Sequence, residues 1–317
     1  MIAADLLPLL ACPACRHGDL AGPGPRVADG QLVCRGCGAR YPIRGGVPIL
    51  VPPSFDASRV HDELDHVHEH KRAQAGYFDR NVAEEFEIDR PHGAPEAYRW
   101  LIAEKFRRGV RRLPPLAGAT VVDACCGSGM DAELLAGAGA RVIAIDLSEG
   151  CARRAKRRAE RYGLDYLVVV ADVERLPLRD AAADIAYVHD GLHHLADPIL
   201  GVRELARVAR RGVSINEPAD ALGTAAMVKL GVAQAREDAG NRVARLRAED
   251  LERELSGRGF RVSAERYLMY YRHAPGPIMR AASRPVARHA YRAAVIAANS
   301  ALGRWGNKLQ VTAVRAA

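Results

Sequence analysis

The chain has 317 residues, 49% hydrophobic and 26% charged, a composition typical of a protein with a buried core. That length allows one large domain, or one large and one small domain. It contains no run of eighteen apolar residues, so a membrane span is not expected. The opening stretch "MIAADLLPLLACPAC" lacks the basic region of a signal peptide. We therefore expect a cytoplasmic protein, in which clustered cysteines bind metal rather than form disulfides.

The formal net charge of +8 raises the question of an anionic partner such as RNA. Basic residues are concentrated at 153–161, at 207–212 and in the last fifty residues. These runs lack the interleaved aromatics expected of a base-stacking surface. The alternative, which we favour, is an arginine-rich composition with solvated helix faces.

Two Cys-x-x-Cys pairs near the amino terminus predict a metal site. The stretch "CPAC" contains Cys12 and Cys15, "CRGC" contains Cys34 and Cys37, and eighteen residues separate the pairs. Four thiolates complete a closed tetrahedral site, so the sequence predicts structural Zn²⁺, with a disulfide or an iron–sulfur cluster as alternatives. Such metal binding would supply much of the folding free energy of a small segment.

Residues 5–51, which close on "YPIRGGVPIL", resemble the small zinc-ribbon proteins that act as activator subunits of tRNA, rRNA and protein methyltransferases. The resemblance implies a small β-rich module that contacts a methyltransferase. We assign residues 1–52 to this zinc-ribbon domain.

Residues 53–76 are polar and follow two prolines, a pattern that predicts a linker or an exposed helix. The four histidines of this stretch alternate with acids and lack an apolar stripe that would fix them around a metal. We interpret them as solvated. They are His61, His66, His68 and His70.

Short β-branched runs alternate with helical stretches after residue 119, which predicts a parallel sheet covered by helices on both faces. The expected strands are 120–125, 141–146, 166–172, 184–190 and 212–218. Two later strands, at 261–272 and 308–315, enclose a helical insertion near 276–303. The prediction for residues 77–317 is a Rossmann-like α/β fold with a seven-stranded, mostly parallel sheet that ends in an antiparallel pair.

An acidic residue stands at the end of each of the first five predicted strands, where ligands of such sheets bind. These residues are Asp123, Asp146, Asp172, Asp190 and Glu217.

The residues around these acids suggest a nucleoside ligand. Gly127 and Gly129 allow a ligand to approach the backbone, and the carboxylate of Asp146 suits a ribose diol. Asp123 is placed to meet a cationic amino group. Leu147 offers an apolar surface for a purine, and Asp172 with Val173 could contact the adenine edge.

The stretch "GSGMDA" also satisfies G-x-G-x-x-A, so an NAD-binding domain is a competing interpretation. The acid at Asp123 argues against it, because a pyrophosphate would be repelled there, whereas an ammonium group would be attracted.

Four stretches resemble, in order, the motifs of class I S-adenosylmethionine (SAM)-dependent methyltransferases of the type 11-like group. They are "VVDACCGSG", "VIAIDLS", "VVVADVERLPL" and "DIAYVHDGLHHLADP". The resemblance covers about residues 77 to 317 and implies a set of residues that bind SAM. That set is Asp123, Gly127, Gly129, Asp146, Leu147, Asp172, Val173 and His189.

Cys125 departs from the family pattern, which usually has glycine at this position. We expect the cysteine to be tolerated if its φ is negative.

The loop "HDGLHH" follows the fourth strand and faces the expected methyl group. His189, Asp190 and His193 are therefore candidates for a general base, with Glu217 as a further candidate. The alternative is that these histidines only bond the backbone or line the cofactor pocket.

The preferred function is methyl transfer to an O, N or C nucleophile of a small molecule, such as a specialised metabolite. The apolar helical insertion, which could form a lid over such an acceptor, favours this interpretation. The charge and the ribbon's relatives favour a tRNA or rRNA methyltransferase as the alternative. A non-catalytic SAM-binding module and an NAD-dependent oxidoreductase are further alternatives.

Overall fold

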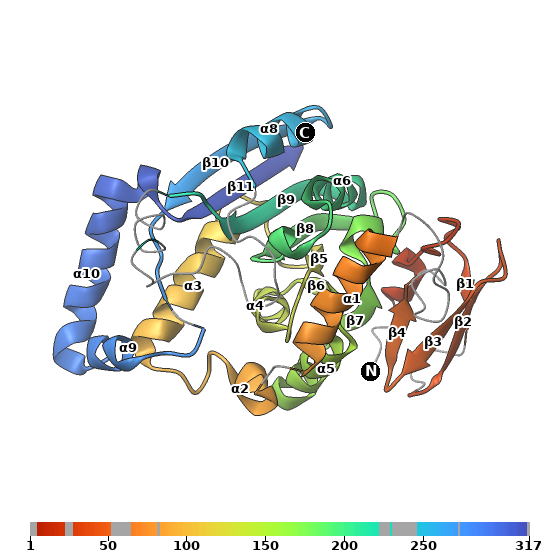
Figure 1. The fold of residues 1–317 in the computed structure, drawn as a ribbon, viewed down its shortest axis with the longest axis horizontal. Helices are drawn as coiled ribbons and strands as arrows, with labels where there is room; N and C mark the ends of the chain where they lie inside the picture. Colours follow the sequence, from red (N-terminus) through yellow and green to blue (C-terminus); the bar gives the residue numbers. More distant parts are fainter. Residues whose placement is uncertain are drawn as a thin grey trace.

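The computed structural model describes residues 5–22, 28–51, 65–80, 83–221, 246–271 and 273–315, together with Lys229. Within these residues, eleven strands form one sheet in the order β1-β2-β3-β4-β7-β6-β5-β8-β9-β11-β10 (Figure 1). The strands are β1 (Leu20–Ala21), β2 (Gly30–Cys34), β3 (Arg40–Arg44), β4 (Val47–Leu50), β5 (Thr120–Ala124), β6 (Arg141–Asp146), β7 (Leu167–Ala171), β8 (Ala183–His189), β9 (Ala209–Pro218), β10 (Phe260–Tyr267) and β11 (Lys308–Arg315).

The seven strands from β5 to β11 confirm the predicted α/β fold. The strands β5 to β9 run parallel, and β11 pairs antiparallel with both β9 and β10. Every residue of β5 and β7 is buried, as the continuous apolar runs predicted. The strand expected at 261–272 ends earlier, because Tyr267 pairs with Lys308, where β11 begins.

Helices cover both faces of the sheet. The helices are α1 (Asp65–Arg80), α2 (Glu84–Asp89), α3 (Glu96–Val110), α4 (Met130–Gly137), α5 (Glu149–Tyr162), α6 (Pro198–Val208), α8 (Ala248–Ser256), α9 (Pro277–Ala282) and α10 (Pro285–Leu302). One face packs against α3, α4 and α5, and the other against α6 and α8. The side chain of Ser148 caps the start of α5, and Gly163 ends that helix with φ +64°.

The zinc ribbon continues the sheet of the main domain rather than lying beside it. Strand β4 pairs parallel with β7, through Ile49 with Val170 and Leu50 with Ala171. Leu10 forms a further β-bridge with Leu178. The two parts therefore share one hydrophobic core, which the sequence did not predict.

The segment predicted as a polar linker contains α1, which also crosses the predicted boundary at residue 76. A helix is present, but the prediction that it would be exposed is wrong, because Lys71 and Gln74 are buried where α1 packs beside α5. His70 Nε2 lies 2.9 Å from the carbonyl oxygen of His194, so it is not simply solvated. His61 lies outside the described residues.

The helical insertion between β10 and β11 consists of α9, α10 and a 3-10 turn at Gly303–Trp305. Helix α10 forms one end of the molecule, with α9 at its foot and α3 on its inner side (Figure 1). None of the helices in the described residues is both long enough and apolar enough to cross a bilayer.

Candidate cofactor and acceptor site

The loop between β5 and α4, residues 125–129, turns sharply at two glycines. Gly127 has φ +54° and Gly129 has φ +79°, both in the region that favours glycine. A Cβ on Gly129 would lie 2.8 Å from Tyr166 Oη and 3.0 Å from Ala155 Cβ, whereas a Cβ on Gly127 would meet only open space. Gly127 therefore borders a space that a ligand can enter.

The condition under which Cys125 would be tolerated is not met, because this residue has φ +54° rather than a negative φ. The backbone there adopts the left-handed conformation that favours glycine, so the cysteine is held in a strained conformation. Its side chain fits beside Gly191, where an added Cβ would lie 2.3 Å from Cys125 Cβ.

Two acids at the strand ends form a cradle around this loop. Asp123 is 1% exposed, and its Oδ2 is buried without a hydrogen-bond partner. Burial, reinforced by Asp131 and Asp146, raises the pKa of Asp123 well above its usual value. The two oxygens of Asp146 accept hydrogen bonds of 2.9 Å from the backbone N–H groups of Gly127 and Ser148, which fixes the carboxylate. A buried carboxyl group with one unpaired oxygen, together with the fixed carboxylate of Asp146, fits a ligand with an ammonium group and a diol.

Asp172 is already bound by a lysine that the sequence did not single out. Lys71 of α1 lies 2.6 Å from Asp172 Oδ2 and 2.7 Å from Glu174 Oε2. Burial lowers the pKa of Lys71, but the two carboxylates outweigh that effect and raise it. Leu147 is partly exposed, whereas Val173 is buried in the core, so their predicted contacts with the purine remain predictions.

Two arginines of α5 donate hydrogen bonds to the loop at residues 125–129, which we call the glycine loop. Arg154 and Arg158 are 2% and 0% exposed. Arg154 Nε donates to Ser128 Oγ over 3.1 Å, and Arg158 Nε donates to the carbonyl oxygen of Ser128 over 2.8 Å. The interpretation of the basic run 153–161 as a solvated face is therefore wrong for these two residues. Arg157 and Arg161 are paired with acids of α2, which leaves little of the run for nucleic acid.

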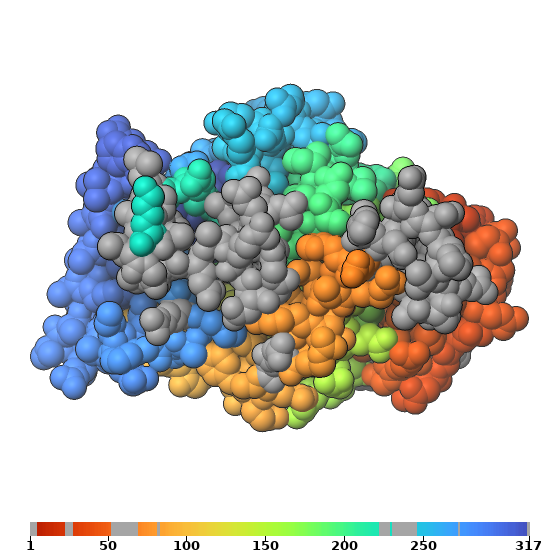
Figure 2. Space-filling model, viewed as in Figure 1, coloured from red at the N-terminus to blue at the C-terminus, as the bar shows by residue number. Residues whose placement is uncertain are grey.

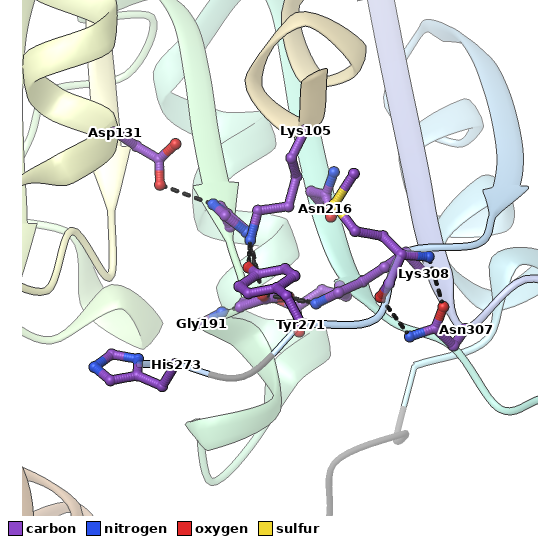
Figure 3. A network of polar contacts seen from close by, with 12 residues as sticks. Lys105, Asp131, Gly191, Asn216, Tyr271, His273, Asn307 and Lys308 are labelled. Carbon is purple, nitrogen blue, oxygen red and sulfur yellow. Dashed lines mark hydrogen bonds and ion pairs between the residues drawn. The ribbon is translucent and has the colours of Figure 1, made fainter. Parts of the chain in front are cut away.

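The carboxyl ends of β8 and β9 carry a network of charged side chains (Figure 3). His189 Nδ1 lies 2.7 Å from Asp131 Oδ2, and its Nε2 lies 3.1 Å from Asp190 Oδ2 without hydrogen-bond geometry. Burial and Lys105 lower the pKa of His189, but Asp131 and Asp190 outweigh them, so the net shift is upward.

Asp190 binds two lysines. Lys308 Nζ lies 2.6 and 2.7 Å from its two oxygens, and Lys105 Nζ lies 3.3 Å from Oδ2. Burial raises the pKa of Asp190, but Lys308, Lys105 and His189 together hold it well below its usual value. Lys105 also donates to Tyr271 Oη, and burial raises the pKa of Tyr271 to about 12, so this phenol stays protonated.

Glu217 holds the loop that follows β8. Its Oε1 accepts hydrogen bonds of 2.8 Å from the backbone N–H groups of Gly191 and Leu192, and its Oε2 lies 2.7 Å from His193 Nδ1. Glu217 and His193 are 0% and 1% exposed. Through these contacts both residues help to position the loop that follows β8.

Most of the cations in the site were missed by the sequence-based reasoning. Lys71, Lys105 and Lys308 come from segments remote from the motifs, and no local signal distinguishes them from ordinary helix or strand residues. Tyr271, which binds Lys105, lies after β10 and was missed as well. Asp131, by contrast, stands directly after "GSGM" and could have been proposed from its place in the glycine loop.

The four predicted metal ligands lie together in the ribbon. The Sγ atoms of Cys12, Cys15, Cys34 and Cys37 are all within 4.8 Å of one another. Cys12 and Cys37 are 3.7 Å apart and Cys15 and Cys34 are 3.6 Å apart. A tetrahedron with Zn–S bonds of about 2.3 Å requires sulfur separations of about 3.8 Å. The donor set therefore fits Zn²⁺, and these cysteines are not joined as disulfides.

Comparison with known proteins identifies two segments. Residues 122–215 match the family model described as a methyltransferase domain, and residues 4–46 match the model described as Trm112p-like protein. Both resemblances stated from the sequence are thereby confirmed.

Several curated proteins are similar to about a third of the chain. Demethylmenaquinone methyltransferase of Clavibacter sepedonicus is 36% identical over 32% of this chain and 41% of that protein. 27-O-demethylrifamycin SV methyltransferase of Amycolatopsis mediterranei is 38% identical over 32% of this chain and 38% of that protein. Ubiquinone biosynthesis O-methyltransferase of Thiobacillus denitrificans is 36% identical over 33% of this chain and 46% of that protein. The chain spans less than half the length of these curated relatives.

Solved structures show the same fold at low identity. Phosphoethanolamine N-methyltransferase 2 of Haemonchus contortus has a TM-score of 0.51 and 15% identity, over 77% of this chain and 60% of that one. Magnesium protoporphyrin IX methyltransferase of Synechocystis has a TM-score of 0.50 and 19% identity, over 78% of this chain and 100% of that one. The chain therefore has the methyltransferase fold and contains a methyltransferase domain of the matched family, preceded by a Trm112p-like zinc ribbon.

Proposed function

We propose that the protein is a SAM-dependent methyltransferase that acts on a small-molecule acceptor. The observation that carries this proposal is the buried Asp123, whose Oδ2 has no partner beside the open space at Gly127. In this proposal Asp123 binds the ammonium group of SAM, and Asp146 binds the ribose diol. Asp172, Leu147 and Val173 lie at the adenine end.

When bound, SAM supplies an electrophilic methyl group. The chain's own residues have to orient the acceptor atom in line with that methyl group and exclude water. The glycine loop and the loop after β8 lie at neighbouring strand ends, since β5 pairs directly with β8. The charged network of β8 therefore borders the position expected for the acceptor.

The two buried lysines support an oxygen acceptor. Lys105 and Lys308 are 2% and 8% exposed, and a hydroxyl placed beside them and Tyr271 Oη would have its developing negative charge stabilised. Three relatives are named for methyl transfer to, or in the synthesis of, small molecules, and one of them for O-methylation.

Roles for the predicted base candidates follow from their contacts. His189, oriented by Asp131, is the residue we propose to accept the acceptor's proton. Asp190 is a poor base, because its pKa is held well below its usual value, and we propose that it positions the two lysines. His193 and Glu217 position the loop rather than act as bases.

The ribbon's proposed role is structural. Residues 1–52, held by Zn²⁺, cover the edge of β7 through β4, and an uncovered edge strand invites aggregation. Thiolate ligands persist in a reducing compartment, so we propose a cytoplasmic protein.

The proposal is tested by incubating the zinc-loaded protein and radiolabelled SAM with a panel of phenols, hydroquinones and amines, and separately with mixed tRNA and rRNA. Label transferred to a hydroxyl compound supports the proposal. Label transferred to RNA alone would replace it with the RNA methyltransferase, which the Trm112p-like segment keeps as the second candidate. Binding of SAM without transfer to any acceptor would favour a non-catalytic module.

A further inference from the structure

The helical insertion exposes an unusual amount of apolar surface. Within the described residues, seven large hydrophobic side chains are exposed, and five of them lie in α9, in α10 or in the 3-10 turn that follows. These five are Ile278 (77% exposed), Val286 (91%), Ile296 (58%), Leu302 (50%) and Trp305 (49%). Exposed apolar side chains gathered in one region mark a contact surface more often than chance.

Helix α10 turns its apolar side toward solvent, the reverse of the usual arrangement in a surface helix. None of its residues is buried. Its partly covered side carries Arg288 and Arg292, which both pair with Glu96 of α3. The outward side carries Val286 and Ile296, with exposed alanines and one exposed histidine, His289, between them. A solvated helix normally presents its charges outward, so this helix has an apolar side that the described residues leave uncovered.

The carboxyl-terminal segment that carries this apolar surface is basic. No acidic residue follows Glu265 in the sequence, whereas nine lysines and arginines do. Arg280 and Arg284 are exposed near the start of α10, and Arg304 is exposed near its end, where its guanidinium lies 3.7 Å from the ring centroid of Trp305. Arginines and a tryptophan around an apolar helix face are the composition of an interfacial helix.

We infer that α9 and α10 dock the protein on an anionic lipid surface, with α10 lying in the plane of the interface. Val286 and Ile296 would enter the acyl boundary, while Arg280, Arg284 and Arg304 would meet lipid phosphates. Figure 2 shows the blue atoms of α10 at one end of the molecule. This surface is separate from the acceptor site and does not depend on the proposed methyl transfer.

The charge pattern favours lipid over the other possible occupants. In a symmetric dimer α10 would meet its own copy, and both of its ends carry exposed arginines, so like charges would face each other. An RNA would be met by the arginines but not by an aliphatic helix face. An anionic bilayer satisfies both features together.

The insertion also connects to the acceptor site. Met279 and Ala282 of α9 pack in one cluster with Tyr98 and Leu101 of α3. Helix α3 also carries Lys105, which binds Asp190. Docking through α10 would therefore hold the acceptor site near the lipid surface.

The experiment is vesicle flotation of the full-length, zinc-loaded protein. Vesicles of phosphatidylcholine are compared with vesicles that also contain about 30% phosphatidylglycerol. We expect binding only to the anionic vesicles, and a decrease in binding as the salt concentration rises. The double variant Val286→Glu, Ile296→Glu should reduce the bound fraction about tenfold or more. Arg280→Gln and Arg284→Gln should each weaken binding about fivefold.

The control is Leu200→Glu, which places one glutamate, against two in the double variant, on an exposed apolar residue of α6. It should bind vesicles as the wild type does. The substituted residues are exposed, so the variants should fold normally, which thermal unfolding verifies. Equal binding to uncharged vesicles, absence of binding to anionic vesicles, or equal loss in the Leu200→Glu control would each overturn the inference. So would sedimentation velocity showing a dimer that Val286→Glu dissociates, without vesicle binding.

Discussion

Lys308, the first residue of β11, holds the carboxylate of Asp190, which directly follows β8, with its Nζ 2.6 and 2.7 Å from the two oxygens. The strands β8 and β11 are separated in the sheet by β9. The pair thus ties the carboxyl-terminal part of the chain to the loop that faces the proposed methyl group.

Lys308→Met should destabilise the protein by about 2 kcal/mol, because it removes one of the two lysines that bind the half-buried carboxylate of Asp190. It should also lower kcat more than it raises KM, if Lys308 stabilises charge that develops in the transition state. Urea unfolding and steady-state kinetics measure the two effects. The double variant Lys308→Met, Asp190→Asn should recover part of the stability but not of kcat, and full recovery of kcat would assign Lys308 to folding alone.

The pH dependence of activity should report His189. A base must be neutral to accept a proton, and the net raised pKa of His189 means that it becomes neutral only above its ordinary pKa of 6.5. The rate should therefore rise with pH across a range centred above that value. His189→Gln should lower kcat about a hundredfold or more and remove this pH dependence. A profile that is unchanged in the variant would exclude His189 as the base.

The strained backbone at Cys125 predicts an unusual order of stabilities. Both Cys125→Gly and Cys125→Ala lose the sulfur that lies beside Gly191, but only glycine adopts φ +54° without strain. The glycine variant should be more stable than the alanine variant by about 1 kcal/mol. Thermal unfolding of the matched pair measures this difference, and equal or reversed stabilities would mean that the loop changes its backbone conformation.

Loss of one zinc ligand should destabilise the ribbon and the edge of the main sheet together. Cys34→Ser should release Zn²⁺ and promote aggregation, because β4 would no longer cover β7 reliably. Atomic emission spectroscopy measures the metal, and light scattering measures the aggregation. Cys151→Ser, which changes a buried cysteine outside the cluster, should retain full zinc. Stoichiometric zinc in Cys34→Ser would contradict the assignment.

Much of the fold was predictable because it follows from local patterns. The alternation of buried β-branched runs with helical periodicity predicted the strands β5 to β9, and the acids at the ends of these strands led to the proposed site. The Cys-x-x-Cys spacing predicted the ribbon's cluster. These signals are local because a strand, a cap or a knuckle is defined by a few consecutive residues.

The remaining features depend on contacts between distant segments. Lys105 and Lys308 read as ordinary solvated lysines, and only the folded chain brings them to Asp190. Arg158 belongs to a basic run that looks solvated, yet it is fully buried because it binds the glycine loop and Glu133. The pairing of β4 with β7 is likewise invisible in sequence, since either strand alone reads as an edge or as a core strand.

The most direct test of the account is calorimetric titration with S-adenosylhomocysteine of the wild type, Asp146→Ala, Asp146→Asn and the exposed control Asp165→Ala. The account predicts binding to the wild type and to the control with similar affinity. Both Asp146 variants should bind at least about tenfold more weakly, since a charged acceptor of two hydrogen bonds is lost. Folding of each variant is verified by thermal unfolding. Absence of binding to the wild type, or full affinity in the folded Asp146 variants, would contradict the proposed site.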